Sequence, residues 1–168
     1  MHSRDVLSSA YTQIGETLDR LLDGLTADQL TTRPGPAANP IGWLAWHLLR
    51  VQDDHVAEVA DHEQVWTAAG FAGRFALDVD DGAIGYGMST AEVGAVQITD
   101  PALLGEYSAA VHARTAEFLD TLSDADLDRV VDTSWDPPVT LGVRLISVIG
   151  DDLQHLGQIG YVRGLLGR

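Results

Sequence analysis

The stretch Asn39-Pro-Ile-Gly-Trp-Leu-Ala-Trp-His-Leu-Leu-Arg50 is the most informative part of this chain for its fold. A capping side chain followed directly by proline is a strong helix start, so we expect Asn39 as the N-cap and Pro40 as the first helical residue. The helix should run to about residue 60. Counting by turns, Trp43 and His47 fall on the same apolar face. The sequence therefore predicts a long helix with a histidine within its buried stripe.

Three further segments have the apolar periodicity of long helices. They cover about residues 3–24, about 101–122, which starts at Asp100-Pro101, and about 141–164, which Thr140 opens. Residues 61–98 contain many glycines, and we expect an ordered crossover with short helical turns there. Short connections after the first and third helices, with one long connection between the second and third, favour neighbouring antiparallel pairs. The predicted fold class is all-α: a four-helix bundle with one long crossover.

Size and composition favour one soluble domain that covers residues 1–168. Hydrophobic residues make up 45% of the 168 residues, which is ordinary for a globular protein. The N-terminus has no basic segment followed by an apolar run, and no stretch reaches about 18 uninterrupted apolar residues. We therefore expect a cytoplasmic protein that does not interact with membranes.

Charge and cysteine usage exclude several classes of function. The net charge is −15, and the ten basic residues are scattered arginines, so a nucleic-acid partner is not expected. The chain has no cysteine, which excludes disulfides, cysteine nucleophiles and cysteine metal ligands. Any bound metal must be held by histidine, aspartate or glutamate.

A second informative stretch is Ile149-Gly-Asp-Asp-Leu-Gln-His155, in the last predicted helix. Either Asp151 or Asp152 occupies a core-facing position, where an unpaired carboxylate costs several kcal/mol or becomes protonated. There is no lysine, and the nearest arginines lie about two turns away. Asp151 and His155 are four residues apart, so their side chains project into the same volume. We prefer Asp151 as a partner of His155, with Asp152 as the alternative.

Two imidazoles and a carboxylate on facing helices match the composition of an open divalent-metal site. The predicted ligands are His47, Asp151 and His155, and the remaining coordination positions would belong to water or substrate. The alternative is a structural hydrogen bond between Asp151 and His155 in the core, with His47 nearby. We expect the other histidines to be solvated or locally hydrogen-bonded. Glycines at positions 157, 160 and 164 of the same helix would be explained by close approach of another helix.

Taken together, residues 39–48 and 151–158 resemble the DinB superfamily. The resemblance implies a four-helix bundle with one metal-binding histidine on the second helix and two ligands on the fourth. The usual motif on the fourth helix is His-x-x-x-His, and this chain departs from it by having Asp151 in the first position. Related mycothiol-dependent isomerases use a carboxylate there. The segments Val65-Trp, Gly85-Tyr-Gly and 131–139 are similar to a branch of mycothiol S-transferases.

The open site and this resemblance together lead to the hypothesis of a metal-dependent thiol S-transferase. Its expected cofactor is a divalent metal, Zn first, with Ni, Mn or Fe also compatible with the ligands. The expected partners are a low-molecular-weight thiol such as mycothiol and an electrophile, and a homodimer is compatible with the fold. Two alternatives remain open: a metal-dependent hydrolase or isomerase using the same site, and a non-catalytic bundle that binds metal for stability or mediates dimerisation.

Overall fold

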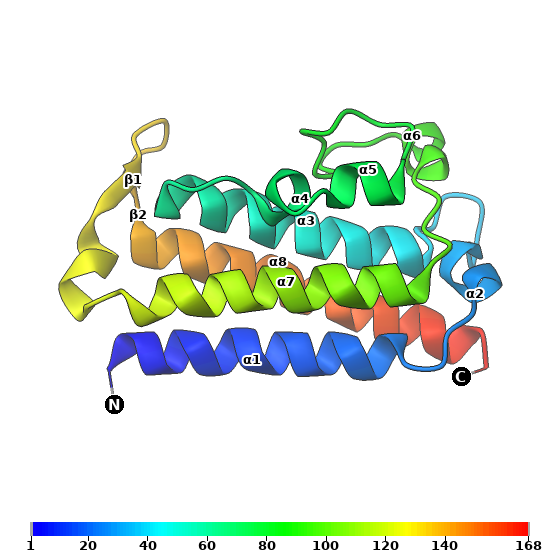
Figure 1. Ribbon diagram of the computed structural model, residues 1–168, viewed down its shortest axis with the longest axis horizontal. Helices are drawn as coiled ribbons and strands as arrows, with labels where there is room; N and C mark the ends of the chain where they lie inside the picture. The colour runs from blue at the N-terminus through cyan, green and yellow to red at the C-terminus, as the bar shows by residue number, and fades with distance from the viewer. Residues whose placement is uncertain (1, 168) are drawn as a thin grey trace.

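Four long helices form a bundle (Figure 1). The computed structural model describes residues 2–167, and its long helices are α1 (Ser3–Leu22), α3 (Ile41–Ala60), α7 (Pro101–Asp120) and α8 (Leu141–Leu165). The connections contain α2 (Ala27–Thr31), α4 (Val65–Ala68), α5 (Phe71–Phe75), α6 (Thr90–Ala95) and a short 3-10 helix (Asp124–Asp128). The predicted all-α fold and the boundaries of its four main helices are confirmed to within a few residues.

A capping side chain marks the start of α7, whereas α3 begins without one. The Asp100 carboxylate accepts hydrogen bonds from the amides of Ala102 and Leu103, directly before the proline that opens α7. The prediction of Asn39 as the cap of α3 is wrong by one residue. Pro40 is the N-cap, with an extended ψ of 159°. The proline ring fixes φ but leaves ψ to the surroundings, so the sequence could not decide whether Pro40 lies inside the helix.

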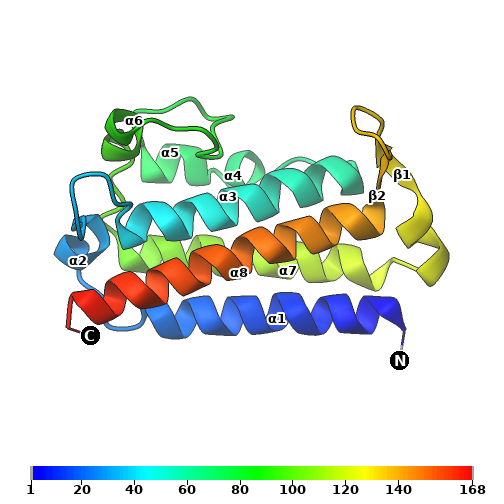
Figure 2. The same ribbon diagram turned by 180° about the vertical axis from the view of Figure 1, so that it is seen from behind.

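The helices run up, down, down and up along the chain. Figures 1 and 2 show α1 and α8 running in one direction and α3 and α7 in the other. The main contacts join α3 to α8 and α7, and α1 to α7 and α8. The two helices of each pair joined by a shorter connection, α1 with α3 and α7 with α8, are therefore antiparallel but lie diagonally opposite each other in the bundle. The prediction that they are neighbours is wrong. Segments 23–40 and 121–140 each contain a helical turn and are long enough to cross the end of the bundle.

Helix α3 is covered on all sides along its first part, where residues 41–53 are all buried. Helices α7 and α8 cover two of its sides. The crossover of residues 61–100, which contains α4, α5 and α6, covers a third and lies above α3 in Figure 1. This confirms the predicted ordered crossover. A helix enclosed in this way must find partners for each polar side chain it carries.

Two features of the second half of the chain differ from the sequence expectations. The loop around Trp135 is flanked by a small antiparallel hairpin, β1 (Val130–Asp132) and β2 (Val139–Thr140), which has too few residues to show an alternating pattern. The glycines at positions 157, 160 and 164 of α8 are not explained by close packing within residues 2–167. A Cβ at Gly157 or Gly164 would meet nothing within 4 Å, and one at Gly160 would meet only Leu21.

Candidate metal centre

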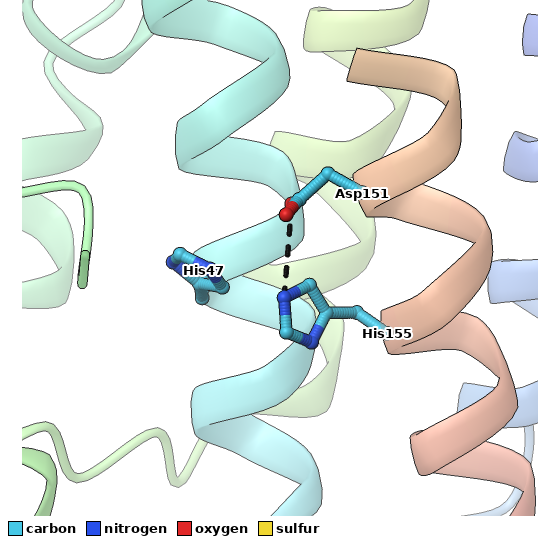
Figure 3. A group of neighbouring side chains, drawn as sticks. All are labelled: His47, Asp151 and His155. Atoms are coloured by element: carbon cyan, nitrogen blue, oxygen red, sulfur yellow. Dashed lines mark ion pairs between the residues drawn. The ribbon is translucent and has the colours of Figure 1, made fainter. Parts of the chain in front are cut away.

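Three predicted ligands from two helices converge at the interface between α3 and α8 (Figure 3). His47 projects from α3, whereas Asp151 and His155 project from successive turns of α8. Each residue offers one ligand atom, and these atoms all lie within 4.8 Å of one another. The antiparallel contact between α3 and α8 brings together residues that are about a hundred positions apart in the sequence.

His47 is held in place by contacts on two sides. Its ring stacks on Trp43, with centroids 4.7 Å apart and an interplanar angle of 16°. Its Nδ1 lies 2.5 Å from the carbonyl oxygen of Ile84 in the crossover. A carbonyl only accepts hydrogen bonds, so Nδ1 carries the proton and Nε2 keeps the lone pair that a metal requires. The hydrogen bond from the crossover therefore selects the tautomer that can bind metal.

His155 and Asp151 complete the group. The Nδ1 of His155 lies 3.0 Å from the Gln158 side-chain oxygen, so its Nε2 also keeps a lone pair. That Nε2 is 3.7 Å from Asp151 Oδ2, which is buried and has no hydrogen-bond partner among residues 2–167. A separation of 3.7 Å is too long for a hydrogen bond. The alternative of a structural hydrogen bond between Asp151 and His155 is therefore not what the structure contains.

The electrostatic surroundings favour a neutral His47. Burial lowers the pKa of its imidazole, and the neighbouring His155 lowers it further, although the Ile84 carbonyl and Asp151 act in the opposite direction. At neutral pH the ring is therefore unprotonated. A metal ligand must be unprotonated, so binding does not have to displace a proton from this ring.

The donor set fits one divalent cation. With bonds of about 2.0–2.2 Å, two ligand atoms of a tetrahedral ion lie about 3.3–3.6 Å apart, close to the separation of Asp151 Oδ2 and His155 Nε2. The clearest structural sign that a ligand is required is the position of the buried Oδ2 oxygen of Asp151, which has no hydrogen-bond partner among residues 2–167 and lies within 4.8 Å of a ligand nitrogen from each of two histidines. Two imidazoles and one carboxylate leave at least one coordination position for another group.

Asp152, the alternative ligand, has a different environment. Its side chain is 0% exposed, and neither of its oxygens has a hydrogen-bond partner in the described part of the chain. Burial raises its pKa well above the usual value, and the charge of Asp151 adds to the effect. The sequence left open which of the two aspartates faces the core. Asp152 holds that position, whereas Asp151 is partly exposed and faces His155.

Sequence reasoning missed the residues that hold the crossover over His47. Arg50 is completely buried and donates hydrogen bonds to the carbonyls of Ala83 and Asp81 and to the Gln64 side chain. These contacts fix the chain immediately before Ile84. The signal was present in the sequence, because Arg50 occurs within an otherwise apolar stretch of α3, but its partners lie in a glycine-rich segment without periodicity.

Gly85 makes the close approach of the crossover to His47 feasible. Its φ is +91°, and a Cβ at this position would lie 2.7 Å from Nδ1 of His47. A side chain would displace the imidazole from the Ile84 carbonyl, and the positive φ would also be strained for any residue with a Cβ. Glycine at position 85 therefore has a local role in orienting His47.

A pocket opens beside the triad of His47, Asp151 and His155. It has a volume of about 590 Å³, and Asp151 forms part of its wall. The other lining residues come from α3, the crossover, the β1–β2 hairpin and the start of α8. This is the space from which a small molecule could reach Asp151, one of the three converging ligands.

No helix within residues 2–167 is long and apolar enough to cross a membrane.

No curated protein matches the chain. Among solved structures, the crystal structure of a conserved protein from Enterococcus faecalis is 31% identical, with a TM-score of 0.93, over 100% of this chain and 99% of that chain. A DinB-like protein from Bacillus cereus ATCC 10987 is 17% identical, with a TM-score of 0.65, over 96% of this chain and 91% of that chain, and it supports the fold alone.

The family model of the DinB superfamily matches residues 10–159, which include the triad and all of α3 and α7. The match covers most of the chain and agrees with the helical bundle described above. The chain therefore belongs to the DinB superfamily.

Proposed function

We propose that the chain is a metal-dependent S-transferase that conjugates a low-molecular-weight thiol, of the mycothiol type, to an electrophile. The observation that carries the proposal is the buried Asp151 oxygen, which has no hydrogen-bond partner within residues 2–167 and faces two imidazole nitrogens with available lone pairs. The proposed metal is zinc, since imidazole and carboxylate ligands in an open site are compatible with it. Nickel, manganese and iron are the other candidates.

The composition of the chain supports a thiol cosubstrate. There is no cysteine, so a sulfur nucleophile must come from outside the protein. A divalent metal at this site would supply Lewis acidity that lowers the pKa of a thiol at the open position, from about 8.5 in the free molecule. Two neutral histidines and one carboxylate contribute a single negative charge. The site would then keep one net positive charge, which favours an anionic thiolate.

The proposed reaction balances without a redox partner. The thiol loses its proton to solvent, and the sulfur lone pair forms a carbon–sulfur bond with the electrophile. The leaving group departs with the electron pair of the bond that breaks. In this scheme the Ile84 carbonyl and Trp43 keep His47 oriented, and Asp151 helps to set the charge of the site.

The direct test is thiol consumption by tag-free protein with a chromogenic electrophile such as 1-chloro-2,4-dinitrobenzene. Zinc-loaded wild type should accelerate conjugation of mycothiol, and His155→Ala should lose this activity. His62→Ala, which alters a histidine outside the triad, should retain it. If every cellular thiol tested is left unconsumed while model esters or amides are cleaved, the transferase proposal is wrong and a hydrolase using the same ligands replaces it.

A further inference from the structure

The pocket beside the triad combines an apolar wall with a few polar side chains, of which Arg144 and His55 are already engaged within the protein. Four structural units surround its volume of about 590 Å³: α3, the crossover, the β1–β2 hairpin and α8. A ligand pocket of this size is typical of small-molecule sites. Its aliphatic lining residues are Val51, Ile84, Val139, Val143 and Val148.

The one cationic side chain in the lining is engaged within the protein. Arg144 donates hydrogen bonds to Glu58 at 2.7 Å and to Asp132 at 3.0 Å, so its positive charge is matched by two carboxylates. His55 lies 3.2 Å from the same guanidinium, and burial together with that charge lowers its pKa. The neutral His55 and the paired Arg144 offer no net positive charge to an anionic ligand. Asp151 is the acidic residue in the lining.

Two aromatic side chains at the rim are unusually exposed. Tyr86 of the crossover is 86% exposed and Trp135 of the hairpin loop is 68% exposed, yet both line the pocket. Large aromatic rings gain free energy when they are covered, at roughly 25 cal/mol per Å² of apolar surface. They come from two separate loops and border the same pocket, so each can provide apolar contact to a ligand that enters it.

We infer that this pocket binds the apolar, ring-bearing part of an uncharged electrophile and presents its reactive carbon toward Asp151. The inference rests on the proposed transferase function and adds the substrate class. A negatively charged electrophile is disfavoured because the guanidinium of Arg144 is already paired with Glu58 and Asp132, and because the chain has a net charge of −15. A low-molecular-weight thiol is polar, and its hydroxyl and amide groups would find few hydrogen-bond partners on the valine-rich wall.

The first experiment compares 2-chloroacetamides that share one reactive group. The N-methyl, N-butyl and N-benzyl compounds are uncharged and increase in apolar size, whereas the N-carboxymethyl compound is anionic. With zinc-loaded protein and mycothiol, kcat/KM should rise at least tenfold from N-methyl to N-benzyl, and the anionic compound should be the poorest substrate. Equal values across the uncharged series would overturn the inference.

The second experiment measures binding without turnover, so that its result does not depend on the transferase proposal. N-benzylacetamide lacks a leaving group, and its affinity can be followed by NMR titration of zinc-loaded, 15N-labelled protein. The double variant Tyr86→Ala, Trp135→Ala should bind it about tenfold more weakly, without a change in thermal stability, because both rings are exposed. The control Leu153→Ala alters an apolar residue of α8 that is also exposed, at 55%, but lies outside this pocket, and this variant should bind normally.

These outcomes separate the two proposals. Weakened binding in the double variant, with no thiol transfer by wild type, would support the pocket assignment and contradict the transferase. Unchanged binding would contradict the pocket assignment even if conjugation occurs. A raised KM for mycothiol in the double variant, with the N-benzyl preference intact, would show that the thiol occupies this pocket and would also overturn the inference.

Discussion

Helix α3 contributes to two buried polar groups that differ in how well they are satisfied. Toward α8 it contributes His47 to the triad with Asp151 and His155. Toward α4, α7 and the crossover it contributes Arg50 and Asp53, which we call the Arg50–Asp53 cluster. Asp53 accepts hydrogen bonds from the amides of Val65 and Trp66 and from the Tyr107 hydroxyl. Arg50 lies 3.6 Å from Asp53 and bonds to the crossover.

The difference separates a structural role from a ligand-binding role. In the Arg50–Asp53 cluster both carboxylate oxygens and the guanidinium have partners within the protein, so it is complete as it stands. The triad leaves Asp151 Oδ2 without a hydrogen bond among residues 2–167 and keeps two imidazole lone pairs directed at it. Neither burial nor a missing hydrogen bond identifies a binding site alone, since the buried oxygens of Asp152 also have no partner within residues 2–167. What distinguishes the triad is that ligand atoms of three residues lie within 4.8 Å of one another.

The largest expected effect is the loss of folding stability when the Arg50–Asp53 cluster loses its carboxylate. Asp53→Ala would leave two amides, a tyrosine hydroxyl and a buried arginine without their acceptor, and should lower the free energy of unfolding by about 3–5 kcal/mol. Urea denaturation of the metal-free protein measures this. The neighbouring Asp54→Ala, which removes one hydrogen bond from a partly exposed residue, should cost about 1 kcal/mol or less. Equal losses in both variants would mean that the cluster is not the anchor we describe.

The second prediction distinguishes the two aspartates of α8. Asp151→Ala should weaken zinc binding by at least about 100-fold, because the loss of a ligand should exceed the 10–100-fold cost of losing an outer partner. Asp152→Ala should have a smaller effect, since its buried side chain is not part of the triad. Competition with a chromogenic zinc chelator gives both affinities. A greater loss in Asp152→Ala would reverse the assignment.

The third prediction concerns the support that the crossover gives to His47. Gly85→Ala would place a Cβ 2.7 Å from Nδ1 of His47 and should reduce zinc affinity by about 10–100-fold. Gly87→Ala is a matched control, because it also has a positive φ but its Cβ would meet nothing within 4 Å in the described chain. Both variants should lose stability from backbone strain, while only the first should lose affinity. The same chelator competition detects the difference.

The fourth prediction tests the protonation of Asp152. Its raised folded-state pKa means that the folded protein binds more protons than the unfolded chain above about pH 3.9, the usual value for an unfolded aspartate. Protonation of Asp152 therefore stabilises the folded protein at low pH, and this stabilisation is lost as pH rises through the folded-state pKa. Asp152→Asn should therefore be more stable than wild type by a margin that grows from pH 5 to pH 8. The margin should grow by about 1.4 kcal/mol per pH unit for as long as Asp152 stays protonated in the folded protein.

Thermal or urea unfolding of the metal-free proteins at the two pH values provides the measurement. Asp54→Asn, on a partly exposed residue, should show no such trend. A constant difference between wild type and Asp152→Asn would mean that Asp152 is ionised in the folded protein throughout this range.

Helix positions and ligand spacing followed from local sequence patterns. Apolar periodicity, the Asp100-Pro101 start and the separation of Asp151 and His155 each depend on residues within a few turns, so the four helices and the pairing of Asp151 with His155 were predictable. The approach of His47 to this pair is a long-range contact, and it was expected only from facing helices in a bundle and from the resemblance to the DinB superfamily. The diagonal arrangement of connected helices and the contact of Ile84 with His47 depend on long-range packing of irregular chain. Glycine-rich segments carry no periodic signal, and for this reason the Arg50 anchor and the role of Gly85 were missed.

The most direct test of the central claim is zinc stoichiometry of tag-free protein, measured by elemental analysis after removal of weakly bound metal. Wild type and the control His62→Ala should each retain one zinc ion per chain, whereas His47→Ala and His155→Ala should retain less than about a tenth of an ion, as expected for loss of a coordinating imidazole. If wild type retains no divalent metal after zinc loading, or if both triad variants retain a full equivalent, then His47, Asp151 and His155 do not form a metal centre.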